Sequence, residues 1–283
     1  MSVLSISRPT GARRTPALFG FAGAAILFTG LMTAGAQAAS VDASAKYVIS
    51  LGGFNFATVG VDFKSSGSDY SVAIGADISG VARLVANGTA RANSAGAVRG
   101  TELAPNAFSV ETKAARARMN VDVEFSGGDT SAFKVEPPVI DTIGRVALER
   151  RQLRGVTDPI ASFILKGRTL ESSLCNRQMK IFSGMERYDI SMRFAEMTEA
   201  TSSRTGYQGP VVLCQITYKP IAGHYENSEM TDYLATSNKM LIWYAPLANS
   251  GYFIPYRVLM GTAAGDLSMV LTDLEAQTDV ASN

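Results

Sequence analysis

The feature that most constrains this chain is an alternation of apolar and polar residues with a period of two. In residues 58–63, Val59, Val61 and Phe63 alternate with polar or small residues. The pattern recurs in residues 70–74, 121–125, 188–194, 212–218, 240–244, 256–260 and 267–271. Side chains alternate between the two faces of a strand, so each segment predicts a strand with one apolar face. Such strands are typical of an antiparallel sheet with one side in water.

Clusters of turn-forming residues separate these segments about every 8–14 residues, which favours a β-barrel or a β-sandwich. The strongest break is Glu136-Pro137-Pro138. Each half of the chain alone would leave open sheet edges, so we read this break as a loop within one domain. We predict an all-β fold for residues 39–283, in which a strongly curved antiparallel sheet forms an open barrel or spiral.

One short helix is expected at residues 158–165. Asp158 is a good N-cap, Pro159 suits the first helical position and Gly167 suits the end. Two helical turns need packing to hold them, so we expect this helix to lie in or against the curved sheet. The alternative is an ordinary connecting turn with hydrophobic anchors. A second short helix is expected at residues 226–235.

The first 38 residues have the pattern of a signal peptide. Arg8, Arg13 and Arg14 precede an apolar run, and Ala36-Gln37-Ala38 matches an A-x-A cleavage site. We predict export, cleavage after Ala38 and a periplasmic protein. An uncleaved membrane anchor is the alternative, although the run of 17 residues is at the short limit for a membrane helix.

Charge argues against several classes of partner. Without the three leader arginines, the 26 basic residues become 23, against 25 acidic residues. A nearly neutral chain has no electrostatic footprint for nucleic acid.

No second stretch of 18 apolar residues occurs, so we expect no transmembrane helix in residues 39–283.

Cys175 and Cys214 are the two cysteines of the chain. In an oxidising periplasm we expect them to form a structural disulfide, because their spacing does not fit C-x-x-C redox chemistry. Two buried thiols are the alternative.

Residues for catalysis are scarce. His224 is the single histidine, and no G-x-S-x-G motif precedes it. No Cys/His cluster suggests a metal site, and we expect no cofactor. Paired carboxylates could still act as acid and base, but no spacing singles out a pair.

Aromatic residues and methionines provide the candidates for ligand contact. Flexible thioethers and aromatic rings suit an adaptable apolar pocket. On the interior of a barrel, Tyr188, Met192, Phe194 and Trp243 could contact a lipid or an acyl chain. The alternative is that the same residues simply pack in a solid hydrophobic core and contact no ligand.

Several short motifs carry a family resemblance. Residues 156–162 read VTDPIAS, residues 182–189 read FSGMERYD, and Cys214 is followed by PIAG at residues 220–223. These segments resemble the motifs V-x-D-P-x-S-A, F-D-G-R-x-R-Y-D and C-x-x-x-x-x-P-I-x-G of a family of exported proteobacterial proteins of unknown function, domain family 3108. Ser183 and Met185 replace an acid and an arginine of the family pattern.

The resemblance covers nearly all of residues 39–283 and includes a closing P-x-R…G hairpin. The family has no assigned catalytic residues, so the resemblance implies none here. The matching positions of this sequence are Asp158, Pro159, Gly184, Arg187, Tyr188, Pro220, Gly223, Pro255 and Gly265.

Together these patterns lead to three functional hypotheses. The first is a non-catalytic protein of the periplasmic cell envelope that binds a lipid, an acyl chain or an envelope polymer on a concave β surface. The second is a structural or interaction protein that docks a periplasmic protein partner. The third is a hydrolase that acts through carboxylates.

Overall fold

The computed structural model describes residues 40–79, 88–114, 117–139, 142–262 and 264–279. The chain divides into Met1–Ala36 and Gln37–Asn283, and all described residues belong to the second unit. The predicted signal peptide, residues 1–38, therefore lies outside the described residues.

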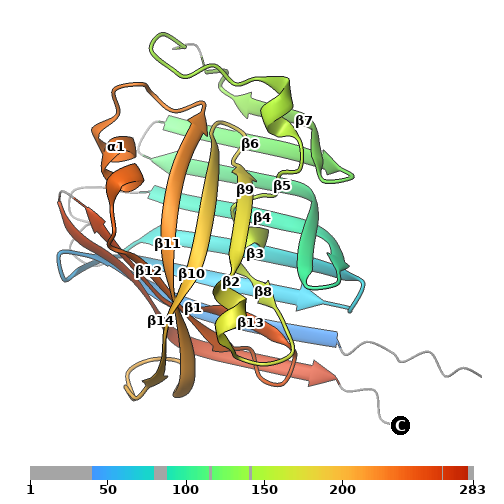
Figure 1. Cartoon of the computed structure of the whole chain (residues 1–283), viewed down its shortest axis with the longest axis vertical. Helices are drawn as coiled ribbons and strands as arrows, with labels where there is room; N and C mark the ends of the chain where they lie inside the picture. Colours follow the sequence, from blue (N-terminus) through green and yellow to red (C-terminus); the bar gives the residue numbers. More distant parts are fainter. Residues whose placement is uncertain (1–39, 80–87, 115–116, 140–141, 263, 280–283) are drawn as a thin grey trace, which may run out of the picture. The chain divides into compact units, whose positions relative to one another are not determined.

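Long antiparallel strands make up most of this unit, as the alternation predicts (Figure 1). The first half of the chain forms β1 (Ser40–Leu51), β2 (Phe54–Ser65), β3 (Asp69–Ile78), β4 (Gly88–Arg99), β5 (Glu102–Ala114), β6 (Ala117–Ser126) and β7 (Asp129–Glu136). The second half forms β8 (Leu165–Lys166), β9 (Arg177–Phe182), β10 (Arg187–Ala200), β11 (Gly209–Ala222), β12 (Met240–Pro246), β13 (Tyr252–Thr262) and β14 (Gly265–Asp279).

Helical segments in the described residues are short. The α-helix α1 (Glu229–Thr236) lies near the predicted residues 226–235, and the Ser228 hydroxyl caps it by accepting the Thr231 N–H. The other helical segments are the 3-10 helices η2 (Arg150–Leu153), η3 (Ala161–Phe163) and η4 (Ser172–Cys175).

The strands form one sheet in the order β7-β6-β5-β4-β3-β2-β1-β14-β13-β12-β11-β10-β9, with β8 paired to β13. Strand β1 pairs with the last strand, β14, and so joins the two halves of the chain. Figure 1 shows β9, β10 and β11 crossing in front of β2–β6, so the sheet curves round to face itself. The predicted fold class, a strongly curved open β sheet, is confirmed.

Sheet edges β7 and β9 do not pair with each other. The gap between them is bridged by residues 155–157: Val156 N–H donates to Gly128 O at 2.8 Å, and Thr157 N–H donates to Lys180 O at 2.8 Å. Side chains complete the contact, since the rings of Phe133 and Phe182 lie 5.1 Å apart. The connecting segment therefore covers part of the edge of β9 and ties it to the turn before β7, which limits pairing of β9 with other chains.

The expected helix at residues 158–165 is wrong in length. The segment forms a single 3-10 turn, η3, and the backbone of Ile164 is already extended. Leu165 and Lys166 then pair with β13 as strand β8. Two turns of helix have little stability of their own, so strand pairing with the sheet decides the conformation. The expected position, in or against the curved sheet, is confirmed, since Ile160 and Phe163 line the hollow on its concave face.

Candidate functional site

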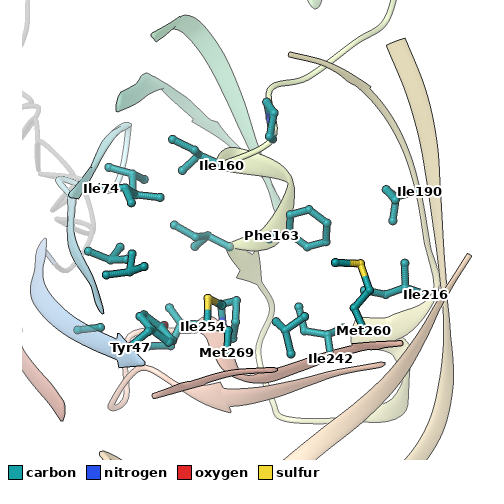
Figure 2. Close-up of a pocket in the computed structure, with 18 of the residues that line it drawn as sticks. Tyr47, Ile74, Ile160, Phe163, Ile190, Ile216, Ile242, Ile254, Met260 and Met269 are labelled. Atoms are coloured by element: carbon teal, nitrogen blue, oxygen red, sulfur yellow. The ribbon is translucent and has the colours of Figure 1, made fainter. Parts of the chain in front are cut away.

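A cavity of about 510 Å³ lies on the concave face of the sheet, beside the η3 turn. Its walls come from β1–β3 on one side and from β10–β14 on the other. Residues 159–164 lie between these walls, and we call them the plug; Pro159, Ile160, Phe163 and Ile164 of the plug line the cavity. Figure 2 shows Ile160 of the plug on the side of Ile74, and Phe163 on the side of Ile190 and Ile216. The hollow thus surrounds the plug.

The lining follows directly from the alternation of the strands. Every described side chain that lines the cavity is Ala, Val, Leu, Ile, Met, Pro, Phe or Tyr. Each strand directs alternate residues inward, so Val59, Val61 and Phe63 of β2 all face the same space. The plug does not fill the space between the opposing walls, so an apolar hollow remains.

Asp158 holds the plug in place. Its side chain is fully buried. Oδ1 accepts the N–H groups of Ile160 and Ala161 at 2.7 and 2.9 Å, and Oδ2 accepts the Ser94 hydroxyl of β4 at 2.7 Å. The Tyr70 hydroxyl lies 3.0 Å from Ser94 Oγ and is left to donate to it. One carboxyl group therefore caps the η3 turn and ties it to β3 and β4.

Burial affects the acidity of this group. Loss of solvent raises the pKa of Asp158 to about 6, and the hydrogen bonds from Ala161, Ser94 and Ile160 oppose that rise. The stability of the plug is consequently coupled to pH.

Three tyrosine hydroxyls are the polar groups of the cavity lining. They belong to Tyr47, Tyr188 and Tyr218, and none of them makes a hydrogen bond to another described residue. Burial raises the pKa of Tyr218 to about 12 and raises the pKa of Tyr47 and Tyr188 as well. The three phenols stay neutral, and each can exchange a hydrogen bond with a ligand.

A second anchor lies at the start of β10. Arg187 is 4% exposed; its Nε donates to Gln152 O at 3.0 Å and its Nη1 donates to Tyr188 O at 2.6 Å. Asp189 supplies the counter-charge, with its Oδ1 2.6 Å from Nη1. Arg187 therefore fixes the segment that leads to the plug against the sheet.

Two motif glycines permit close packing beside this anchor. Gly184 has a φ of +88°, and a Cβ there would lie 2.2 Å from Val121 Cγ1. Gly223 has a φ of +85°, and a Cβ there would lie 2.0 Å from Met185 O. Both positions require glycine for conformation and for space.

The remaining motif residues line the cavity or lie in the strands around it. Pro159 and Pro255 line the cavity. Pro220 lies opposite Tyr188 in the β10–β11 pair, and Gly265 begins β14 with a φ of +113°. The motifs that carried the family resemblance are therefore mostly structural.

The predicted disulfide between Cys175 and Cys214 is confirmed, with the two Cα atoms 5.4 Å apart. It joins η4 to β11. Leu174 and Cys175 pack with Met192, Val212 and other buried residues in one cluster. This cluster includes cavity-lining residues such as Ile190 and Ile216, so the disulfide supports one wall of the cavity.

Of the four predicted ligand-contacting residues, the structure brings Tyr188 to the cavity. Met192 lies in the cluster around the disulfide, where the Tyr244 hydroxyl lies 3.8 Å from its sulfur. Phe194 is 40% exposed and stands where the β10–β11 register shifts. Trp243 is half-buried outside the cavity lining, with the Arg257 guanidinium 5.4 Å from its ring centre.

Sequence reasoning missed most of the lining. Ile190 shares the alternation of Tyr188, and Tyr218 lies directly opposite Ile190 in the neighbouring strand. Only the register of the sheet brings Ile190 and Tyr218 together. Ile160 and Phe163 belonged to the expected helix, but nothing in its pattern indicated which of its residues face a hollow.

Within the described residues, no three His, Cys, Asp or Glu side chains gather closely enough to hold a metal ion. None of the helices described is long and apolar enough to span a bilayer.

Comparison with known proteins gives a fold neighbour. A solved structure, the crystal structure of a beta-barrel-like protein of domain of unknown function DUF1849 from Brucella abortus, aligns with a TM-score of 0.50 and 13% sequence identity. The alignment covers 84% of this chain and 98% of that chain. At this identity the likeness concerns the fold alone, and it agrees with the open β architecture. No curated protein matches the sequence.

Family assignment rests on the sequence. The model of the family "Protein of unknown function (DUF3108)" matches residues 46–272, which span nearly all of the described structure. The matched region contains every motif residue described above, from Asp158 to Gly265. The chain therefore belongs to the DUF3108 family.

Proposed function

We propose that this protein is a non-catalytic protein of the periplasmic cell envelope that binds an acyl chain, or a similar hydrophobic ligand derived from the envelope, on the concave face of its sheet. The observation that carries the proposal is the cavity of about 510 Å³ with its apolar and tyrosine lining. Its volume lies within the range of about 300–1,000 Å³ that is usual for small-molecule sites.

Energetics favour a hydrocarbon in this space. Each methylene group that moves from water into the cavity contributes about 0.8 kcal/mol, so a chain of ten carbons gains about 8 kcal/mol before the costs of ordering. The hydroxyls of Tyr47, Tyr188 and Tyr218 are available to a carbonyl or hydroxyl group of the ligand. An apolar site with a few polar groups is the usual design of a small-molecule pocket.

The non-catalytic assignment is supported by the same lining. The described residues around the cavity include no Asp, Glu, His, Cys, Ser or Thr side chain. Hydrolysis through carboxylates needs two acids at the bound substrate. A ligand in this cavity would meet no carboxylate, and the three tyrosine hydroxyls around it stay neutral.

Export is supported by the leader pattern of residues 1–38 and by the Cys175–Cys214 disulfide. Disulfides persist in oxidising compartments such as the periplasm and are rare in the cytosol. The two observations are independent, since one depends on the leader and the other on the folded domain.

The test is a displacement titration with a fluorescent fatty acid and a series of unlabelled fatty alcohols. We expect the affinity to increase about fourfold for each added methylene until the cavity is full. Native mass spectrometry of the protein purified from the periplasm should also show a co-purified hydrophobic ligand.

Paired variants locate the binding site. Ile216→Phe adds volume at the cavity wall and should weaken binding, whereas Thr217→Phe changes the next, exposed residue of β11 and should not. Thermal unfolding of both variants shows whether each is folded. Equal binding by the two folded variants, or affinity that does not depend on chain length, would contradict the proposal.

A further inference from the structure

A second hollow, of about 760 Å³, lies on the other side of the plug turn. Ala161 and Ser162 of the plug line it, together with the β4–β5 turn, the β6–β7 turn, the loop that follows β8, and β9. It therefore occupies the open side of the sheet, beside edge strand β9. We call this hollow the groove.

Basic side chains dominate the charged lining of the groove. Five bases line it, namely Arg99, Lys166, Arg168, Arg177 and Lys180. Glu102 and Glu171 are the acids. Residues 39–283 as a whole carry slightly more acidic than basic side chains, so this excess is a local feature.

These bases lack carboxylate partners. Within the described part of the chain, the ion pairs all involve other bases, for example Lys46 with Asp273 and Lys239 with Asp266. In the groove, Arg177 donates to Lys166 O at 3.2 Å, and the Lys166 ammonium lies 5.1 Å from the ring centre of Tyr252. Neither contact neutralises a charge.

We propose that the groove binds an anionic group of phosphate or carboxylate type. Arginine recognises such groups through two parallel N–H···O bonds, and lysine adds a mobile positive charge. Bases drawn from the β4–β5 turn, the β8 region and β9 surround one hollow, so an anion there meets positive charge from several sides. Five bases against two acids give the groove a positive potential, which attracts an anion.

The groove adjoins the cavity, and this suggests which molecule carries the anionic group. Ile164 lines both the cavity and the groove, so one turn of the plug separates them. An amphiphile could place its chain in the cavity and its anionic head in the groove. This assignment of the head group rests on the proposed function, whereas the anion site itself does not.

Three probes distinguish the sources of the anion. They are glycerol phosphate, which has no chain, decanoyl glycerol, which has no charge, and decanoyl glycerol phosphate, which has both. We expect the full chain, exported and processed, to bind the last probe about tenfold more tightly than decanoyl glycerol. The preference should decrease with added salt, because the bases are near the surface.

Matched charge variants test the groove. Arg168→Glu with Lys180→Glu reverses two exposed groove charges and leaves Lys166 and Arg177, which make local contacts, unchanged. Arg204→Glu with Lys219→Glu makes the same change of net charge at exposed positions outside the groove. We expect the groove pair to abolish the tenfold preference and the control pair to change it less than twofold.

Each outcome has a definite meaning. A preference that both pairs leave intact, or no preference at all, overturns the anion site. If glycerol phosphate binds as tightly as the amphiphile, with the same sensitivity to the groove pair, the site holds a separate anion. If Ile216→Phe weakens the amphiphile and the neutral lipid alike, the groove holds the head group. Failure of decanoyl glycerol to bind contradicts the proposed function alone.

Discussion

Asp158 gives the sharpest test of how the plug is held. We predict that Asp158→Asn removes a pH dependence of stability and keeps the geometry. The asparagine Oδ1 can still accept the N–H groups of Ile160 and Ala161. Its amide can donate to Ser94 Oγ, and the Ser94 hydroxyl can then donate to Tyr70. The network survives with its direction reversed, and the ionisable group is gone.

The size of the effect follows from the pKa. Burial raises the pKa of Asp158 to about 6 from an ordinary value of 3.8. The folded state therefore binds a proton more tightly than the unfolded chain does. Its contribution to stability is fully present below about pH 4 and is lost as the pH rises through about 6. A shift of about two pKa units corresponds to about 3 kcal/mol.

The assay is urea unfolding of the disulfide-intact protein at pH 4, 5, 6 and 7, followed by the fluorescence of Trp243. The relevant quantity is the unfolding free energy of the wild type minus that of Asp158→Asn, because titration of all other groups cancels. We expect this difference to fall by about 2 kcal/mol between pH 4 and pH 7, less than the full effect because the unfolded carboxyl is already partly ionised at pH 4. Asp122→Asn, at an exposed position of β6, controls for the loss of one carboxylate.

A flat difference between pH 4 and pH 7 would refute the reasoning. It would mean that the hydrogen bonds from Ser94, Ile160 and Ala161 offset the loss of solvent and leave the pKa of Asp158 near its ordinary value. A difference that increases with pH would contradict even the direction of the shift. Asp158→Ala lacks both the carboxyl and the cap, so it should be about 1–2 kcal/mol less stable than Asp158→Asn at every pH.

Three further predictions concern the fold and its export. Replacing Cys175 and Cys214 together by alanine should lower the unfolding free energy by about 4 kcal/mol, since the disulfide closes a loop of 39 residues; an unchanged urea midpoint would count against a structural role. Gly184→Ala should destabilise by at least 1 kcal/mol more than Gly127→Ala in the same assay, because both positions have positive φ but only the first meets Val121; equal losses would leave backbone strain as the sole cause. N-terminal sequencing of the periplasmic protein should begin at Ala39, whereas an intact Met1 would indicate the uncleaved anchor.

Much of the fold could be predicted because strand faces are encoded locally. Val121, Val123 and Phe125 are all buried, and Asp122 and Glu124 between them are exposed, as the alternation predicts. The cysteine pairing could be predicted for a different reason, since a chain with two cysteines offers one possible partner to each.

The candidate site could be predicted only in part. Tyr188 lines the cavity, but Phe194, three alternations further along the same strand, does not. Phe194 pairs in the same continuous register as Tyr188, so alternation puts both on one face of the strand but does not show how far along that face the cavity extends. The conformation of the plug was also not predictable from local sequence. Residues 158–165 have a helical pattern, but Leu165 and Lys166 pair with β13 as a strand.

The sequence by itself determined the all-β class, the inward face of strands such as β2 and β6, and the cysteine pair, because these depend on residue order over a few positions. The tertiary structure alone decided that β1 pairs with β14, that the plug enters the concave face, and that a cavity and a basic groove lie on either side of it. The physical reason is that a hollow exists only where walls from distant parts of the chain fail to meet. That spacing depends on sheet curvature, register and anchors such as Asp158, all of which are set by contacts between residues far apart in sequence.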